Sequence, residues 1–226
     1  MENLLETIEL ETGKNPAATV IWMHGLGADG NDFVPIVNEL DLSGAPATRF
    51  VFPHAPMRPV TINNGHVMRA WYDVSFGDLE GKSRRADGIG VHESQGQINA
   101  LIERENKRGI AAAKIVLAGF SQGGAIALYT GLRYPEKLAG IMALSTYLPL
   151  ADTLPLEFSP VNKATPIFMA HGIYDPVVPL MMGAGSMTFM TGLGYMVDWK
   201  QYSMQHSVCA EEIEDIGAWL RKVLKT

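Results

Sequence analysis

Short apolar runs alternate along most of the chain with segments whose apolar residues recur at helical spacing. The runs have the length of β-strands. Most are apolar on both faces, which is typical of strands covered by helices on both sides of a parallel sheet. The sequence therefore predicts strands at residues 19–23, 50–52, 115–118, 140–144, 167–170 and 198–202.

Helical spacing is clearest in two of the remaining segments. One carries apolar residues at the i, i+3, i+4 and i+7 positions, namely Phe33, Ile36, Val37 and Leu40. Asn31 or Asp32 is available as the N-cap of this helix. The other segment lies near the C-terminus, with Ile213, Ile216, Leu220, Val223 and Leu224. The alternation predicts an α/β fold, with a mostly parallel twisted sheet and helices on both faces.

The length and composition fit one globular domain. The chain has 226 residues, of which 47% are hydrophobic and 19% charged, enough for one full core. We expect this domain over residues 16–226, after an N-terminal extension over residues 1–15 that can add a strand. Residues 53–90 are rich in Pro, Gly and Asn, and we expect part of this stretch to wrap around the rim of a site.

The charge argues against a nucleic-acid partner, because such binding depends on Lys and Arg neutralising phosphates, and the net charge here is −6. The cluster of Lys82, Arg84 and Arg85 is too short to change this and is typical of a solvated loop. The apolar runs are too short to cross a bilayer, and Cys209 is the only cysteine, so no intrachain disulfide can form. We expect a cytoplasmic protein without stable membrane insertion.

The segment Gly119-Phe-Ser121-Gln-Gly123 has the G-x-S-x-G spacing, between the predicted strand 115–118 and a helical segment at 124–130. A serine at a tight strand-to-helix turn adopts a strained backbone that exposes its hydroxyl. The flanking glycines avoid clashes that a Cβ would create there. We interpret Ser121 as a nucleophile; the alternative is a Gly-rich turn with an idle serine.

A serine nucleophile needs a base within hydrogen-bond reach and a third group that holds the base. In sites of this kind the acid and then the histidine follow the serine along the chain. Four histidines precede Ser121, namely His24, His54, His66 and His92. His206 follows the predicted strand 198–202, and we favour it over His171, which we expect to be a packed, hydrogen-bonded structural histidine.

We expect the acid and the oxyanion donors in segments that follow predicted strands. Asp175 follows the strand at 167–170, and we favour it over Asp152, although capping or a turn is the alternative role for either. A tetrahedral intermediate also needs two N–H donors for its oxyanion. We expect these to be the backbone N–H groups of Gln122, directly after the nucleophile, and of Leu26, in the loop after the first predicted strand.

The glycines of that loop also permit a different interpretation. Gly25, Gly27 and Gly30 form a G-x-G-x-x-G sequence after a strand, as in dinucleotide-binding oxidoreductases. Such a site needs an acid at the end of the next strand, and that strand runs instead into Pro53-His54. We therefore favour an oxyanion loop and expect no cofactor.

Two weaker signals for other chemistry also fail. His92-Glu93 lacks the second histidine of a zinc site, and Cys209 lacks a positive neighbour that would activate its thiol. A non-catalytic binding protein on the same scaffold is a further alternative, which the presence of a serine, a histidine and an acid in the expected order disfavours. We expect no metal.

Seven motifs, in order over roughly residues 20 to 220, together resemble the phospholipase/carboxylesterase family of α/β hydrolases, which includes small bacterial carboxylesterases and acyl-protein thioesterases. They are His24-Gly-Leu-Gly-Ala-Asp-Gly, Phe52-Pro-His-Ala-Pro, Val60-Thr-Ile-Asn, Ala70-Trp-Tyr-Asp73, Gly119-Phe-Ser-Gln-Gly-Gly, His171-Gly-x-x-Asp175-Pro-Val-Val-Pro and Met204-Gln-His206-Ser. The fourth motif is more similar to the bacterial carboxylesterases than to the eukaryotic thioesterases.

The resemblance implies the α/β-hydrolase fold, a triad of Ser121, Asp175 and His206, and oxyanion donors at Leu26 and Gln122. It implies cofactor-free hydrolysis of acyl esters, thioesters or lysophospholipids by a protein that is often a homodimer. We expect short- to medium-chain substrates. Candidate substrate contacts are Trp71, Phe76, Leu148, Met181 and Met182, for which a core role is the alternative.

Overall fold

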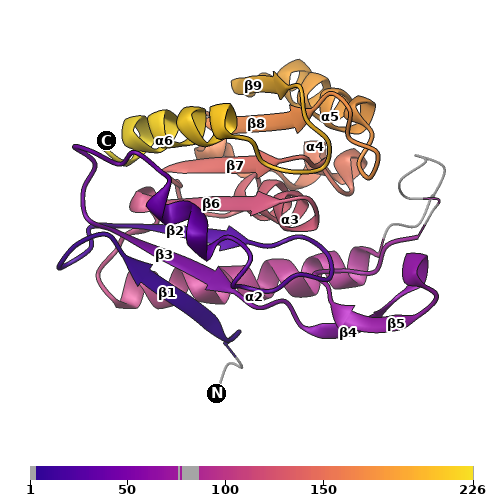
Figure 1. Ribbon diagram of the computed structural model, residues 1–226, viewed down its shortest axis with the longest axis horizontal. Coiled ribbons are helices and arrows are strands. Elements are labelled where there is room, and N and C mark those ends of the chain that lie inside the picture. Colours follow the sequence, from indigo (N-terminus) through magenta and orange to yellow (C-terminus); the bar gives the residue numbers. More distant parts are fainter. Residues whose placement is uncertain (1–3, 76, 78–86, 226) are drawn as a thin grey trace.

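The computed structural model describes residues 4–75, 77 and 87–225. In this part of the chain a seven-stranded sheet has the order β1-β3-β2-β6-β7-β8-β9 (Figure 1). The strands are β1 (Thr7–Glu11), β2 (Ala18–Met23), β3 (Thr48–Pro53), β6 (Ile115–Phe120), β7 (Gly140–Leu144), β8 (Ile167–Gly172) and β9 (Val197–Tyr202). All neighbours are parallel except β1, which pairs antiparallel with β3. Each strand predicted from the sequence lies within an observed one.

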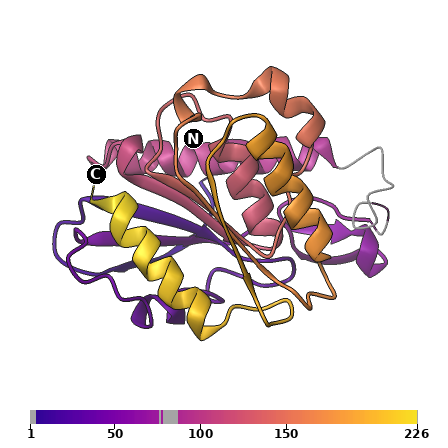
Figure 2. The ribbon, with the colours of Figure 1, turned by 90° about the horizontal axis from the view of Figure 1, so that it is seen from above.

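Helices cover both faces of the sheet, which confirms the predicted fold class (Figure 2). One face carries α2 (Gly88–Lys107), α3 (Gln122–Gly131) and α5 (Leu180–Gly192), and the other carries α6 (Ala210–Leu224). The short α4 (Leu154–Glu157) precedes β8. The strands β4 (Met57–Val60) and β5 (His66–Arg69) form a separate antiparallel pair. Among the described helices, none has the length and apolar character needed to cross a bilayer.

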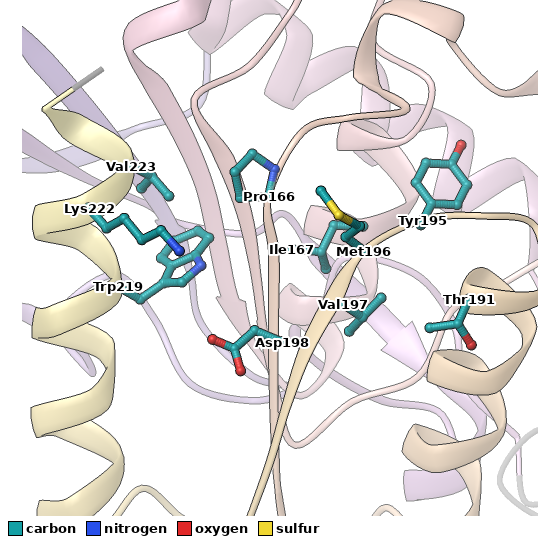
Figure 3. Close-up of a pocket in the computed structure, with 10 residues that line it drawn as sticks. All are labelled: Pro166, Ile167, Thr191, Tyr195, Met196, Val197, Asp198, Trp219, Lys222 and Val223. Atoms are coloured by element: carbon teal, nitrogen blue, oxygen red, sulfur yellow. The ribbon is translucent and has the colours of Figure 1, made fainter.

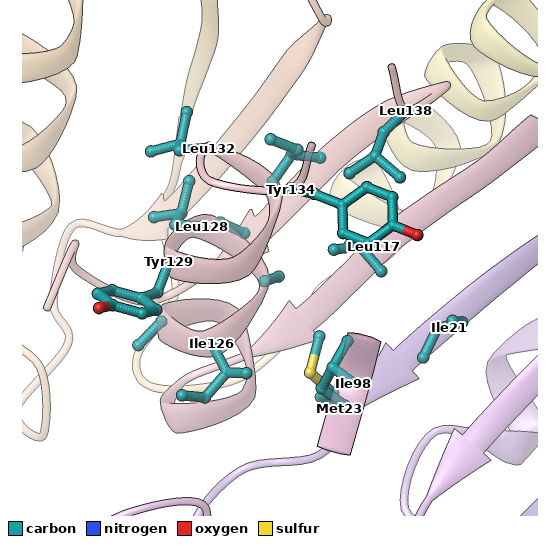
Figure 4. Packing of buried hydrophobic residues seen from close by; sticks show 14 of the residues in the cluster. Ile21, Met23, Ile98, Leu117, Ile126, Leu128, Tyr129, Leu132, Tyr134 and Leu138 are labelled. Carbon is teal, nitrogen blue, oxygen red and sulfur yellow. The ribbon is translucent and has the colours of Figure 1, made fainter. Parts of the chain in front are cut away.

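Alternation along the strands divides the core into two layers, one on each side of the sheet. Ile21 and Leu117 point toward α2 and α3, where Ile126 completes the packing (Figure 4). Their strand neighbours Trp22 and Ala118 point the other way, into the layer beneath α6. Because both faces are covered, both sets of side chains must be apolar, which explains the uninterrupted hydrophobic runs.

The α-helix predicted around Phe33 to Leu40 is wrong in type and in its start. The structure has a five-residue 3₁₀ helix, Val34–Asn38, whose N-cap position is Phe33 and not Asn31 or Asp32. The side chain of Asp29 accepts the N–H of Asn31 at 2.8 Å, and this local bond holds the preceding residues in a turn. The apolar residues of the segment still pack under the sheet, so the pattern predicted burial correctly.

Ion pairs and hydrogen bonds tie β1 to the sheet and to α2. Glu105, fully buried near the end of α2, accepts hydrogen bonds from Thr19 at 3.1 Å and from Arg49 at 2.7 Å. Arg108 bridges Glu105 at 3.1 Å and Glu9 of β1 at 2.9 Å. Although burial alone would raise the pKa of Glu9, the hydrogen bond and charge of Arg108 and the charges of neighbouring arginines hold it below its usual value. Residues far apart in sequence are thereby fixed at one edge of the molecule.

Candidate active site

Ser121 occupies a sharp bend between the end of β6 and the start of α3. Its φ of 54° and ψ of −121° lie outside the regions that residues with a side chain normally adopt. Its N–H donates to the carbonyl oxygen of Leu144 on β7 at 2.8 Å, so the neighbouring strand holds the bend in place. Strain of this kind persists only where the surroundings impose it, and it is common at functional sites.

The two glycines beside Ser121 are required by close backbone packing. A Cβ on Gly119 would lie 2.3 Å from the carbonyl carbon of Gly123. A Cβ on Gly123 would lie 2.3 Å from the carbonyl oxygen of Met23, at the end of β2. The start of α3 therefore rests directly on β2, and the clash expected from the sequence is present at both positions.

His206 and Asp175, from the loops after β9 and β8, meet through a hydrogen bond of 2.7 Å between Nδ1 and Oδ2. The other carboxylate oxygen of Asp175 accepts the N–H groups of Val177 at 2.8 Å and Val178 at 2.9 Å. Burial alone would raise the pKa of Asp175, but these hydrogen bonds, above all that with His206, hold it below its usual value. The ionised carboxylate keeps the imidazole proton on Nδ1, which leaves Nε2 as the basic nitrogen.

Two cavities meet at Ser121. The first, here the His206 cavity, has a volume of about 250 Å³ and is lined by Gly25, Leu26, Ala28, Asp32, Phe120, Ser121, Val177 and His206. The second, here the Tyr147 cavity, has a volume of about 180 Å³ and is lined by Leu26, Ile62, Asn63, Tyr72, Val74, Ser121, Gln122, Tyr147, Val177 and Val178. Leu26, Ser121 and Val177 belong to both.

The structure places both expected oxyanion donors next to Ser121. Leu26 and Gln122 line the Tyr147 cavity together with the serine. Gln122 is fixed by its side chain, which accepts the N–H of Trp71 and donates to the carbonyl oxygen of Tyr72, each at 2.7 Å. The loop that carries Leu26 is held at Gly27, whose φ is +78° and whose N–H donates to Arg69 of β5 at 2.9 Å. Both backbones are therefore rigidly supported.

Hydrogen bonds of His24 hold the loop that carries Leu26. Its Nε2 accepts the N–H of Ala55 at 3.1 Å, so its Nδ1 carries the proton and donates to the carbonyl oxygen of Gly25 at 2.7 Å. Burial lowers the pKa of His24 to about 4. Trp71 is fully buried beside it and donates its Nε1–H to the carbonyl oxygen of His24 at 2.9 Å. Trp71 thus positions the loop and is absent from the walls of the two cavities.

The other candidate substrate contacts are scattered. Leu148 is buried in the core, and its N–H donates to Ser186 of α5 at 2.9 Å, so it lies outside the walls of the two cavities. Met181 is 84% exposed, and Met182 lies partly buried beside it on α5. Phe76 lies outside the described residues.

The rival residues occupy structural positions. His171 is fully buried, and its Nε2 donates to the carbonyl oxygen of Val178 at 2.9 Å. Asp152 is exposed on the 3₁₀ helix Ala151–Thr153. Burial raises the pKa of the Cys209 thiol, which makes it a poorer nucleophile. The loop of Gly25 to Gly30 leads into turns, and no α-helix N-terminus stands there to receive a pyrophosphate.

Most of the residues that line the Tyr147 cavity were not predicted from the sequence. Ile62 and Asn63 reach its wall because Asp73 accepts both the N–H of Thr61 at 2.7 Å and its hydroxyl at 2.6 Å. These residues belong to two of the recognised motifs, Val60-Thr-Ile-Asn and Ala70-Trp-Tyr-Asp73. The joint occurrence of the two motifs was the signal that could have placed them at one site.

A larger cavity, of about 660 Å³, lies at the opposite end of the strands (Figure 3). It adjoins the beginnings of β8 and β9, with Ile167 and Val197 in its wall and Trp219 of α6 on one side. Among its lining residues only Asp198 and Lys222 are charged. Since it shares no residue with the His206 and Tyr147 cavities, its size does not make it the site of chemistry.

The strand order, the covering helices and the strained serine bend at the carboxyl end of a central strand define an α/β hydrolase. The profile of the phospholipase/carboxylesterase family matches residues 6–224. The chain belongs to this family, and it is a serine hydrolase that acts on carboxylic esters. This confirms the resemblance identified in the sequence and excludes the oxidoreductase interpretation.

Individual relatives agree with this assignment. Acyl-protein thioesterase 1 of Gibberella zeae is 41% identical over 213 residues, covering 92% of this chain and 91% of that protein. The Neurospora crassa protein of the same name is 42% identical, covering 92% of this chain and 87% of that protein.

Among solved structures, Arabidopsis thaliana SOBER1 has a TM-score of 0.84 at 31% identity and covers 92% of this chain and 99% of that chain. Zea mays acyl-protein thioesterase 2 has a TM-score of 0.84 at 28% identity, covering 97% and 99%. These relatives are fungal and plant proteins, so the greater similarity to bacterial carboxylesterases stays a prediction.

Proposed function

We propose that Ser121, His206 and Asp175 form a catalytic triad. The observation that carries this proposal is the 2.7 Å bond between His206 and Asp175, made by a histidine that shares a cavity wall with Ser121. His206 is held by a buried carboxylate on one side and packs against the ring of Phe120, with 4.7 Å between centroids. These two contacts restrict the movement of the imidazole beside the cavity that Ser121 also lines, as a catalytic base requires.

The reaction proceeds through an acyl-enzyme. Ser121 Oγ attacks the substrate carbonyl carbon while His206 Nε2 takes its proton, and the resulting oxyanion accepts the N–H groups of Leu26 and Gln122. The C–O or C–S bond to the leaving group then breaks, and the imidazolium donates its proton to that group. Water repeats the sequence on the acyl-serine and releases a carboxylic acid and free Ser121.

The positions of the two cavities support a proposal for where each half of the substrate lies. The leaving group must receive its proton from His206, so it occupies the His206 cavity. The acyl group then lies in the Tyr147 cavity, whose walls include the apolar residues Ile62, Val74 and Val178. Its volume of about 180 Å³ leaves room for only part of a ligand, since complete ligand pockets span roughly 300–1,000 Å³. Short- to medium-chain acyl groups fit this space best.

A second candidate function is hydrolysis of acyl-protein thioesters. It is favoured by the relatives that carry this name and match nearly the whole chain. The proposed chemistry accommodates it, because a thiol leaves more readily than an alcohol and needs less help from His206. Lysophospholipids are a third substrate class with the same acyl bond.

Location and assembly are likewise proposals. We propose a cytoplasmic protein, supported by the single cysteine, which allows no intrachain disulfide. A homodimer is proposed on the family resemblance alone, and sedimentation at micromolar concentration tests it.

Covalent labelling tests the triad. A fluorophosphonate probe should modify Ser121, as mapped by mass spectrometry, and Ser121→Ala should lose turnover by on the order of a millionfold. Ser43→Ala, which removes an exposed hydroxyl elsewhere, is the matched control and should retain full activity. Labelling at another residue, or p-nitrophenyl acetate hydrolysis retained by Ser121→Ala, overturns the proposal.

A further inference from the structure

Two tyrosine hydroxyls meet in the wall of the Tyr147 cavity. Tyr72 and Tyr147 both line this cavity, and their hydroxyl oxygens lie 3.1 Å apart. Tyr72 follows β5, whereas Tyr147 follows β7, so the bond joins segments that are 75 residues apart in the chain. It closes part of the wall around the space in which the proposed function places the acyl group.

The backbone on either side of this bridge is held in place. The carbonyl oxygen of Tyr72 accepts the side chain of Gln122 at 2.7 Å, directly beside the nucleophile. On the other side, the hydroxyl of Thr146 donates to the carbonyl oxygen of Ser121 at 2.6 Å, and Leu148 N–H donates to Ser186 at 2.9 Å. Because both backbones are anchored, the hydroxyl–hydroxyl bond joins two rings whose main chains are already fixed in place.

We propose that the Tyr72–Tyr147 bridge limits the length of the acyl group that the site accepts. This inference rests on the proposed function. A long alkyl chain that separates the two rings breaks their hydrogen bond and offers no donor or acceptor in exchange. Shorter chains fill the space between Leu26, Ile62 and Val74 and leave the bridge intact. The two tyrosines are thus specificity-determining residues, and they take no part in the proton transfers.

Acyl-length profiles of hydroxyl-deleted variants test the proposal. For wild type, Tyr72→Phe, Tyr147→Phe and the double variant, kcat/KM is measured on p-nitrophenyl esters from acetate to laurate. Each substitution removes one hydroxyl and keeps the ring. We expect the laurate-to-butyrate ratio of kcat/KM to rise at least about tenfold, the low end of what one methylene is worth in an apolar pocket.

The double variant adds an independent requirement. Either single substitution already removes the bridge, so the double variant should show no larger ratio than the single variants. Additive effects of the two substitutions contradict the proposal. Tyr147→Ala, which removes the ring at a partly exposed position, should raise the ratio further and serves if Tyr72→Phe fails to fold.

Tyr195→Phe is the matched control. Tyr195 is 3% exposed, lies in the wall of the distant cavity at the start of β9, and packs under the Lys163 ammonium at 4.0 Å. Its hydroxyl is remote from Ser121, so its loss should leave the acyl-length profile unchanged.

Three outcomes overturn the inference: an unchanged ratio, an equal loss on all chain lengths, or additivity in the double variant. An equal loss on all lengths identifies a merely structural bridge. Failure of the proposed function looks different, because then wild type itself hydrolyses none of the esters and Ser121 takes up no fluorophosphonate.

Discussion

At the scale of single residues, the site depends on one strained serine and on the absence of side chains around it. Ser121 has a backbone conformation that is unfavourable in isolation. The surrounding structure imposes it through the bond to Leu144 and through the close contact of Gly123 with β2. The position of the serine beside the two cavities therefore results from packing between backbone segments, and small changes in that packing should alter the site.

Gly123→Ala is expected to destabilise the protein by at least about 2 kcal/mol. The new Cβ would approach the carbonyl oxygens of Met23 at 2.3 Å and His24 at 2.6 Å, and neither backbone can move freely. Gly96→Ala in α2 is the matched control, since its Cβ meets nothing within 4 Å. It should stabilise by roughly 0.5–1 kcal/mol. Urea denaturation measures both, and equal effects would contradict the argument.

His24 should make the protein sensitive to acid. Its pKa is about 4 in the folded state and about 6.5 in the unfolded chain. Between these values the unfolded chain binds a proton that the folded protein excludes, so the free energy of unfolding falls as the pH is lowered from 6.5 to 4. The contribution is on the order of 3 kcal/mol.

The measurement is urea denaturation at pH 7 and pH 4.5. His24→Gln removes the titrating group, so its stability should differ less between the two conditions than that of wild type. An undiminished difference in the variant would assign the acid sensitivity to other groups.

At the scale of elements, strands were predictable and the cavity walls were not. A strand such as β6 is apolar on both faces because helices cover both, and it can be recognised in the sequence as an uninterrupted hydrophobic run. The segment Val34–Asn38 is a 3₁₀ helix and not the predicted α-helix, because the spacing of its apolar residues is compatible with both types of helix. Tyr72 follows β5 of the separate pair and Tyr147 follows β7 of the main sheet, so they become neighbours only through tertiary packing, which local sequence does not encode.

The segment between β4 and β5 is held by a clamp, namely the two hydrogen bonds that Thr61 donates to Asp73. Asp73→Ala removes the acceptor for both bonds of Thr61, and Ile62 and Asn63 then lose their fixed place in the cavity wall. We expect kcat/KM for butyrate esters to fall by about tenfold, since misplaced substrate contacts weaken orientation. Asp198→Ala, at an exposed position on β9, is the control that should leave ester kinetics unchanged. Unaltered kinetics in both variants would show that the clamp does not shape the site.

At the scale of the whole molecule, the residues of the proposed triad could be chosen from the sequence because chain order and topology agree. Asp175 and His206 follow adjacent parallel strands, β8 and β9, whose carboxyl ends necessarily lie at the same edge of the sheet as Ser121. The boundary between residues 1–15 and 16–226 stays a prediction. The structure offers a way to test it through β1.

Removal of residues 1–15 is expected to lower the free energy of unfolding by about 2–4 kcal/mol and to leave kcat unchanged. The truncation exposes β3, uncovers apolar contacts of Ile8 and Leu10, and deprives Arg108 of Glu9. Glu9→Gln in the full chain measures how much of this loss in the free energy of unfolding is due to the ion pairs of Glu9. Loss of esterase activity in a truncated protein that remains folded would place the extension at the site.

On the proposed mechanism, the meeting of two cavities at one serine also determines which molecules can react with the acyl-serine. Once the alcohol or thiol has left, the His206 cavity is the vacant approach to the acyl-serine, and water is activated there by the same imidazole. A small alcohol at molar concentration fits the same vacancy and competes with water. On the proposed mechanism the protein is thus also a transesterase, with the partition between acid and new ester set by the solvent.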